Sequence, residues 1–238
     1  MSGFTLKIIA MISMIFDHTG YLIFNELSPL NYIGRFAFPI FAFEIGQGFT
    51  HTKNLKKYFL RLFIFALISQ IPFQLFLKVL KSSFSLNIFF TLFLGLLSLY
   101  TYNLCKKNKF IALTSVLCIS IIAYFLHVDY GWYGILIIFI LYIFQEKKLC
   151  QVISFILATL INYLIKIITN GFYFEYIYLF IFTCFSLFFI NFYNGKKGKN
   201  VKFIFYLFYP LHLIIIYIIW LLKSWVYSYC HNIFHIFY

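Results

Sequence analysis

Two adjacent ionisable residues, Asp17 and His18, lie in the middle of the apolar run "MIFDHTGYLIF". A carboxylate and an imidazole can both take up and release protons, so together they are candidates for general acid–base chemistry. Neighbouring residues of a helix point about 100° apart, so both side chains can face the interior of a bundle without stacking on each other. An ionisable group at the centre of a membrane helix costs about 2.5 to 3.5 kcal/mol on insertion scales, which makes function the first hypothesis for both residues.

The two groups need partners from other segments. The chain has only six acidic residues, and of these Asp17 and Glu44 lie well inside apolar runs. Arg35, in the next apolar run, is the expected counter-charge of Asp17, and Asp129 is the expected partner that orients His18. Two plainer interpretations stay open: an ion pair that only fixes helix register, and a core histidine that is merely hydrogen-bonded.

A polar stripe follows in the segment "FEIGQGFTH". Its residues Glu44, Gln47, Gly48 and His51 have the i, i+3, i+4 and i+7 spacing of one helix face. Further polar residues interrupt later apolar runs, namely Arg61, Gln70, Gln74, Tyr209 and His212. Together they predict a polar track through an otherwise apolar protein.

The elements that must position these residues are membrane helices. Of the 238 residues 63% are hydrophobic and 11% are charged, which excludes an ordinary water-soluble domain. Apolar runs of about 17 to 25 residues can each cross a hydrocarbon layer of about 30 Å. We expect an all-α, polytopic transmembrane helical bundle in one domain over residues 1–238, with residues 224–238 as an aromatic tail at the membrane interface. Its nine predicted spans are 5–24, 31–50, 58–77, 86–104, 110–127, 131–145, 149–168, 173–193 and 203–222.

Basic residues predict the orientation of this bundle. Of the 19 Lys and Arg residues, 14 fall in the N-terminal segment and alternate loops, and 4 fall in the remaining segments. This asymmetry predicts a cytoplasmic N-terminus and a multi-pass protein of the cell membrane, the plasma or inner membrane. It also explains the net charge of +13 without nucleic acid as a partner, because the lysines form short clusters between apolar runs.

The cysteines and the last histidines predict neither a disulfide framework nor a metal site. The five cysteines are scattered singly, without the spacing of metal ligands. His231 and His235 are four residues apart, but no third ligand accompanies them. We therefore expect no bound metal.

Six ordered stretches resemble a known family. They are "LKIIAMISMIFDHTG", "IGRFAFPIFAF" with "GFTHT" after it, "RLFIFALISQIPF", "NIFFTLFLGLL", "DYGWYGI" and "YLFYPLHLIIIY". In this order they resemble the TraX family of integral membrane acetyltransferases, which is associated with N-terminal acetylation of conjugative pilin. The last stretch is also similar to a late-helix segment of the wider membrane acyltransferase superfamily.

The resemblance implies acetyl-CoA as co-substrate. The phosphates of coenzyme A would bind at the basic inner side, at Arg61 and Lys57. Its pantetheine arm would follow Glu44, Gln47 and His51 toward Tyr209.

The resemblance also implies catalytic roles deeper in the bundle. A peptide N-terminus has a pKa of about 7.7 to 8, so it needs a general base near pH 7. We expect His18 to be that base, with Asp17 and Asp129 setting its electrostatics and His212 near the thioester. Donors to the developing oxyanion would come from Arg35 or from the substrate-binding residues Asn87 and Tyr130. The acceptor would be a peptide or a glycan at the outer side, and direct transfer and an acetyl-histidine intermediate both stay open.

Two other functions are compatible with the same residues. A proton-coupled transporter or flippase also needs buried Asp, Glu, His and Arg side chains. Against it, the sequence shows no repeat symmetry and no pair of Gly- or Pro-broken helices. A non-enzymatic membrane assembly factor is the third possibility.

Overall fold

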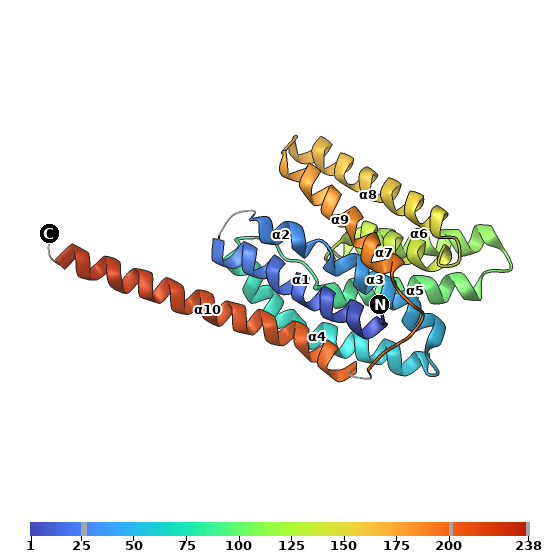
Figure 1. Cartoon of the computed structure of the whole chain (residues 1–238), viewed down its shortest axis with the longest axis horizontal. Coiled ribbons are helices and arrows are strands. Elements are labelled where there is room, and N and C mark those ends of the chain that lie inside the picture. Colours follow the sequence, from blue (N-terminus) through green and yellow to red (C-terminus); the bar gives the residue numbers. More distant parts are fainter. Residues whose placement is uncertain (25–27, 200–201, 237–238) are drawn as a thin grey trace.

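A computed structural model describes the backbone of residues 1–24, 28–199 and 202–236, and its account of the side chains ends at Val226. The described residues form ten helices joined by short connections (Figure 1). They are α1 (Gly3–Phe24), α2 (Pro29–Gly34), α3 (Ala37–His51), α4 (Leu55–Val79), α5 (Ile88–Leu104), α6 (Lys109–Phe125), α7 (Gly131–Ile143), α8 (Lys148–Asn170), α9 (Glu175–Asn191) and α10 (Lys202–Ile236). The predicted all-α fold is confirmed.

The second predicted span is broken into α2 and α3. Pro29 starts α2, where its missing N–H and fixed φ suit a first helical position. Pro39 has no N–H to donate to the carbonyl of Arg35 four residues earlier, and its ring crowds that carbonyl. The helix is therefore interrupted at Arg35 and Phe36.

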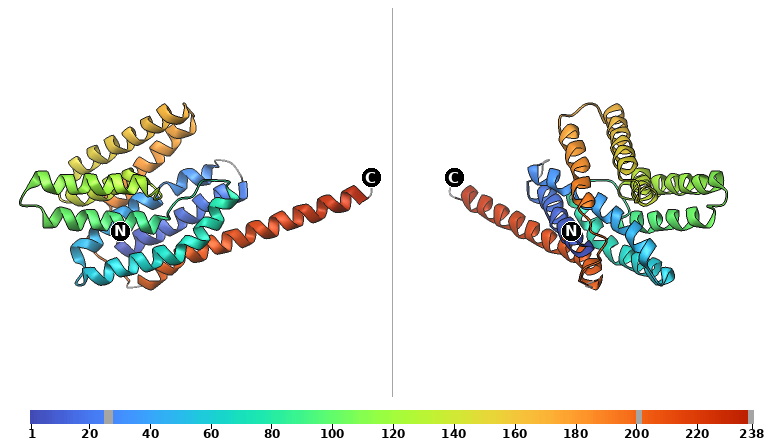
Figure 2. Two further views of the ribbon diagram at one scale, coloured as in Figure 1. Left: turned by 180° about the vertical axis from the view of Figure 1, so that it is seen from behind. Right: turned by 45° about the vertical axis from the view of Figure 1, so that its right-hand side comes forward.

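The central helix of the bundle is α7. It packs against α3, α5, α6 and α8 (Figure 1), and the side chains of Ile135, Ile137, Ile138 and Leu141 are fully or almost fully buried. With 13 residues α7 is about 20 Å long, which agrees with the short sixth span read from the sequence. Helices α8 and α9 form an antiparallel pair at one side of the bundle (Figure 2).

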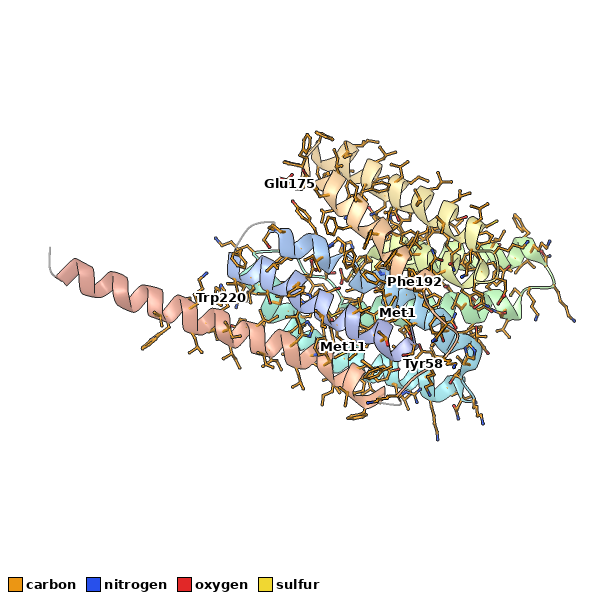
Figure 3. The ribbon with its side chains drawn as sticks, viewed as in Figure 1. Met1, Met11, Tyr58, Glu175, Phe192 and Trp220 are labelled. Carbon is orange, nitrogen blue, oxygen red and sulfur yellow. The ribbon has the colours of Figure 1, made fainter. Side chains whose placement is uncertain are left out.

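The basic connections gather at one end, here called the basic end. The N-terminal amine of Met1 donates to the carbonyl of Phe192, and Gly3 N–H donates to the carbonyl of Lys196 at 2.9 Å. Figure 3 shows Met1, Phe192 and Tyr58 close to this end. The hydroxyl of Tyr142 donates to Asn103, which joins the ends of α7 and α5 there. The C-terminal ends of α1, α4, α6 and α8 lie at the opposite end (Figure 1).

The surface of the bundle is that of a membrane protein. Among the described residues, α1, α4, α8 and the part of α10 from Phe203 to Val226 are long and apolar enough to cross a membrane, while α5, α6, α7 and α9 are shorter apolar helices. Large apolar side chains project outward along α4, including Leu67, Ile68 and Ile71, and carbon atoms dominate the outer surface in Figure 3. Such a surface suits contact with lipid.

The C-terminal tail continues the last helix. We predicted an aromatic tail at the membrane interface over residues 224–238, and its described part belongs to α10, which runs without interruption over 35 residues and leaves the bundle (Figures 1 and 2). A helix of this length measures about 52 Å and exceeds the thickness of the hydrocarbon layer. The side chains of His231 and His235 lie outside the described residues.

The end of α2 packs directly on α1, and Gly34 makes this contact possible. A Cβ atom at Gly34 would overlap the Cβ and carboxyl atoms of Asp17. We predict that Gly34→Ala lowers the free energy of unfolding by about 1 to 3 kcal/mol, the usual cost of overpacking. Thermal unfolding in detergent measures the loss.

Gly46→Ala is the matched control for this substitution. A Cβ atom at Gly46 would have its nearest neighbour, the Cβ of Tyr142, at an ordinary 3.4 Å. Equal melting temperatures for the two variants would contradict the tight contact at Gly34.

Candidate active site

Two histidines from the first and last helices form a hydrogen-bonded pair. Nδ1 of His18 lies 2.8 Å from Nε2 of His212. Nδ1 of His212 lies 2.9 Å from the carbonyl oxygen of Phe208, which can only accept a hydrogen bond. In a neutral ring, His212 therefore carries its proton on Nδ1 and accepts through Nε2, so His18 donates from Nδ1. This assignment leaves Nε2 of His18 as the nitrogen with a free lone pair.

Aromatic rings hold the pair in place. Phe208 stacks on His212 with ring centroids 4.7 Å apart, and Phe76 meets His18 edge to face at 4.8 Å. The ring of Tyr209 lies 6.3 Å from that of His18 and 5.5 Å from that of His212. The side chain of His212 is buried, so the rings packed around it restrict its rotation.

An ion pair next to the histidines ties α1 to the break between α2 and α3. Arg35 donates from Nη2 to the carboxylate of Asp17 and from Nε to the carbonyl of Asn31. The amide of Asn31 in turn donates to the carbonyl of Asp17 at 2.8 Å. The predicted pairing of Asp17 with Arg35 is confirmed, and it fixes the part of α1 that carries His18.

A cavity of about 310 Å³ enters the bundle from the basic end. Five of the six residues predicted to bind the co-substrate line it: Glu44, Gln47, His51, Arg61 and Tyr209. Lys57 does not; its side chain is exposed, and its backbone N–H donates to the cap residue Asn54. The helical spacing of Glu44, Gln47 and His51 in the sequence therefore predicts three of the polar residues that line this cavity.

Three further cations also line the cavity, namely Lys7, Lys197 and Lys199. In the sequence, these three lysines predict only the orientation of the bundle. Lys197 reaches the cavity because its carbonyl accepts the N–H of Phe4, which joins the linker before α10 to the start of α1. No pattern within either segment predicts this pairing, because the two are separated by almost the whole chain.

Several polar atoms in the cavity wall lack hydrogen-bond partners. Lys7 pairs with one oxygen of Glu44 at 2.5 Å, but the other oxygen, Oε1, has no partner among the described residues. The same holds for Nε of Arg61 and the hydroxyl of Tyr209. Buried polar atoms are normally satisfied, so a polar ligand or water is the natural partner of these atoms.

The deep end of the cavity lies one helical turn from the histidine pair. Met14 and Phe208 line the cavity, and they precede His18 and His212 by four residues each. Four residues correspond to a rise of about 6 Å. Neither histidine lines the cavity itself, and Tyr209 lies between the cavity and both rings.

The structure corrects the partner expected for His18. Its Nδ1 pairs with His212 rather than with Asp129. Asp129 lies in the turn between α6 and α7, where its N–H donates to the carbonyl of Leu86. Burial there raises the pKa of the Asp129 carboxyl to about 7, partly offset by the Arg35 guanidinium.

Asn87 caps a helix, and both N–H groups of its side-chain amide are engaged within the protein. Its amide donates to the carbonyl of Ala66 and to Gln70, and its oxygen accepts the N–H of Phe89 at the start of α5. Gln70 and Gln74 both donate to the carbonyl of Ser85 and hold the loop before α5. The expectation that Asn87 contacts the substrate is therefore corrected.

Tyr130 lies apart from the histidines. Its φ of 61° lies in the left-handed region, and its ring stacks on Phe38 with centroids 3.8 Å apart. It lines a second cavity together with Arg35. Of the predicted site residues, five line the first cavity, Arg35 and Tyr130 line the second, and the others line neither.

Comparisons with known proteins give one family. The family model described as "TraX protein" matches residues 2–220. A probable fimbrial assembly protein, FimC of serogroup H1, from Dichelobacter nodosus is 30% identical over 172 residues, which cover 67% of this chain and 69% of that protein. An uncharacterized protein, RP591, from Rickettsia prowazekii (strain Madrid E) is 28% identical over 146 residues, or 60% of this chain and 56% of that protein. No solved structure matches.

Removing one member of the Asp17–Arg35 pair leaves the other charge buried and unpaired. We predict that Arg35→Gln lowers the free energy of unfolding by about 3 to 5 kcal/mol, and that Arg35→Gln combined with Asp17→Asn recovers part of this loss. Thermal unfolding in detergent measures both variants. Lys148→Gln, which removes an exposed charge at the basic end, serves as the control. A double variant less stable than Arg35→Gln alone would contradict the pairing.

Proposed function

The chain belongs to the TraX family, and from this we propose that it is an integral membrane acetyltransferase. It moves an acetyl group from acetyl-CoA to an amine, or to a hydroxyl, of an acceptor at the opposite side of the membrane. One observation carries the proposal: the His18–His212 pair lies one helical turn beyond a cavity that enters from the basic end. The name of the Dichelobacter nodosus relative favours a peptide of a pilus or fimbrial subunit as the acceptor.

The basic end is the side where coenzyme A binds in this proposal. Its nucleotide head carries several phosphates, and Arg61, Lys197 and Lys199 line the entrance without a carboxylate in ion-pair contact among the described residues. Arg61 offers a planar guanidinium that can hold two phosphate oxygens at once. The pantetheine arm then extends inward past Gln47 and Leu62 toward Met14.

His18 takes the acceptor's proton in the transfer step. Nε2 of His18 accepts a proton from the acceptor amine while the amine nitrogen forms a bond to the thioester carbonyl carbon. The C–S bond then breaks, the thiolate of coenzyme A leaves, and the proton on His18 returns to that sulfur. His212 holds the His18 ring in the tautomer that leaves Nε2 unprotonated.

Tyr209 provides the hydrogen-bond donor for the oxyanion. Its hydroxyl is buried, donates to no acceptor among the described residues, and belongs to the residue between the cavity and both histidine rings. A donor aimed at the developing oxyanion contributes on the order of 10² to 10³ in rate. Tyr209 replaces Asn87 and Arg35 in this role, because both N–H groups of the Asn87 amide are engaged and Arg35 lines the second cavity rather than the first.

The free lone pair of His18 also suits a two-step transfer. In that route Nε2 attacks the thioester and forms an acetyl-histidine, which the acceptor amine then cleaves. Mass spectrometry of the protein after incubation with acetyl-CoA alone separates the routes, because only the two-step route leaves an acetyl group on His18.

His18 and His212 are predicted to differ in their effect on the reaction. We expect His18→Ala to lower the release of free coenzyme A from acetyl-CoA and a peptide acceptor by about 10² to 10⁴, the usual contribution of a general base. The His212→Ala variant should lose less activity than His18→Ala, because a water molecule can take over the hydrogen bond to His18. The assay follows free thiol with the purified protein.

His127→Asn is the control for both histidine variants. His127 is exposed at the opposite end and its φ of 50° suits asparagine. A normal rate in His18→Ala would move the base to another residue. If the wild-type protein failed to bind coenzyme A at all, a carrier function would replace the enzymatic one.

Arg61 is predicted to act on binding rather than on chemistry. Arg61→Gln should raise the KM for acetyl-CoA by about tenfold at unchanged kcat, because it removes a charge-assisted phosphate contact far from the thioester. Steady-state kinetics with varied acetyl-CoA measures the effect. Lys57→Gln is the matched control, since Lys57 is a neighbouring cation outside the cavity. An equal change in both variants would contradict a specific phosphate site.

The basic end faces the cytoplasm in this proposal, where acetyl-CoA is made. Cys105 and Cys150 are free thiols next to the basic connections. An impermeant thiol reagent added to intact cells should leave both unlabelled and should label them after the membrane is opened. Labelling in intact cells would reverse the orientation.

A further inference from the structure

A second cavity, separate from the one at the basic end, lies at the opposite end of the bundle. It has a volume of about 240 Å³ and is formed by residues of α3, α7, α8 and α9 with the break before α3. Its polar wall includes Arg35, Tyr130, Asn162, Tyr163 and Lys166. It shares no lining residue with the first cavity.

Hydrogen-bond donors outnumber acceptors in this wall. The ammonium of Lys166 lies 5.3 Å over the ring of Tyr163 and forms no ion pair with a described carboxylate. Arg35 uses Nε and Nη2 in the contacts given above, which leaves the N–H groups of Nη1. Neither the amide of Asn162 nor the hydroxyl of Tyr130 has a hydrogen-bond partner among the described residues. The matching ligand is an anion with several acceptor oxygens.

The two carboxylates nearest to this wall do not fill the cavity. Asp17 is held by Arg35 on the side of α1, and Asp129 lies next to Tyr130 in the chain without lining the cavity. Thr183, the other polar residue from α9, already donates to the carbonyl of Leu179 at 2.7 Å. The cavity therefore presents cations and neutral donors toward its interior.

The depth of the cavity corresponds to the headgroup region of a bilayer. Lys166 and Asn162 lie four and eight residues before the end of α8, or about 6 and 12 Å along its axis. The turn from α8 to α9 carries the exposed aromatic residues Phe172, Tyr173 and Phe174. Such residues mark the boundary between lipid and water, so the cavity begins just below it.

The surroundings of the cavity favour a lipid over a soluble anion. The outward faces of α8 and α9 next to it carry the exposed apolar side chains of Leu164, Ile165 and Ile181. Lys166 is exposed on α8 and also lines the cavity. Its side chain therefore lies where this apolar surface meets the cavity. An anion that enters here from the membrane can keep its acyl chains against these side chains.

We propose that this cavity binds the phosphate of an anionic phospholipid from the leaflet at the opposite end. Arg35 and Lys166 contact the phosphate oxygens, and Tyr130 and Asn162 donate to the phosphate or to the glycerol headgroup. The acyl chains lie along α8 and α9. The site is independent of acetyl-CoA and of the histidine pair.

Native mass spectrometry of the purified full-length protein in a neutral detergent tests this site. Phosphatidylglycerol is titrated against the wild type, Lys166→Gln, Tyr130→Phe and the control Lys148→Gln, which removes a lysine at the other end of α8. We expect Lys166→Gln to weaken binding at least fivefold, Tyr130→Phe to weaken it less, and Lys148→Gln to leave it unchanged. Lys166→Arg should restore binding, which separates loss of the charge from misfolding.

Two further ligands identify the source of the phosphate. Phosphatidylcholine should bind more weakly than phosphatidylglycerol, because its headgroup carries a compensating positive charge. Equal binding of phosphatidylglycerol to the wild type and Lys166→Gln would overturn the proposal. Saturable binding of inorganic phosphate without binding of the lipid would also overturn it, because the site would then belong to a soluble anion.

Discussion

The structure depends on pairing the ionisable groups of α1 inside an apolar bundle. Asp17 meets Arg35 and His18 meets His212, so neither is left unsatisfied where water is scarce. The Asp17–Arg35 pair connects α1 to the break between α2 and α3, and the His18–His212 pair connects α1 to α10. They connect the start of the chain with its last helix, and they explain why α1 can carry two such residues side by side.

The other features of the site follow from this arrangement. Gly34 lets α2 approach Asp17, and the break at Arg35 turns the guanidinium toward α1. The start of α1 is tied to the linker before α10, which brings Lys197 and Lys199 to the rim of the first cavity. Because the histidine pair bridges α1 and α10 one turn further in, the same two helices form the entrance and the deep end.

Local patterns in the sequence predict part of this site, and long-range packing decides the rest. The helical fold follows from the apolar runs, and the pairing of Asp17 with Arg35 follows from the scarcity of buried charge. The stripe of Glu44, Gln47 and His51 follows from helical spacing. The contact between His18 and His212 joins positions 194 residues apart, so no spacing rule could find it. Asn87 was misread because a helix cap and a substrate donor need the same amide chemistry.

A structure with a non-reactive thioether analogue of acetyl-CoA tests the central claim most directly. Electron cryomicroscopy of the protein with this analogue should show the phosphates against Arg61, Lys197 and Lys199. The thioether sulfur should reach the histidine pair. The Tyr209 side chain should have moved out of its position between the first cavity and the two histidine rings. Density for the analogue outside the first cavity, or a His18–His212 pair still closed off behind Tyr209 with the analogue fully bound, would contradict the account.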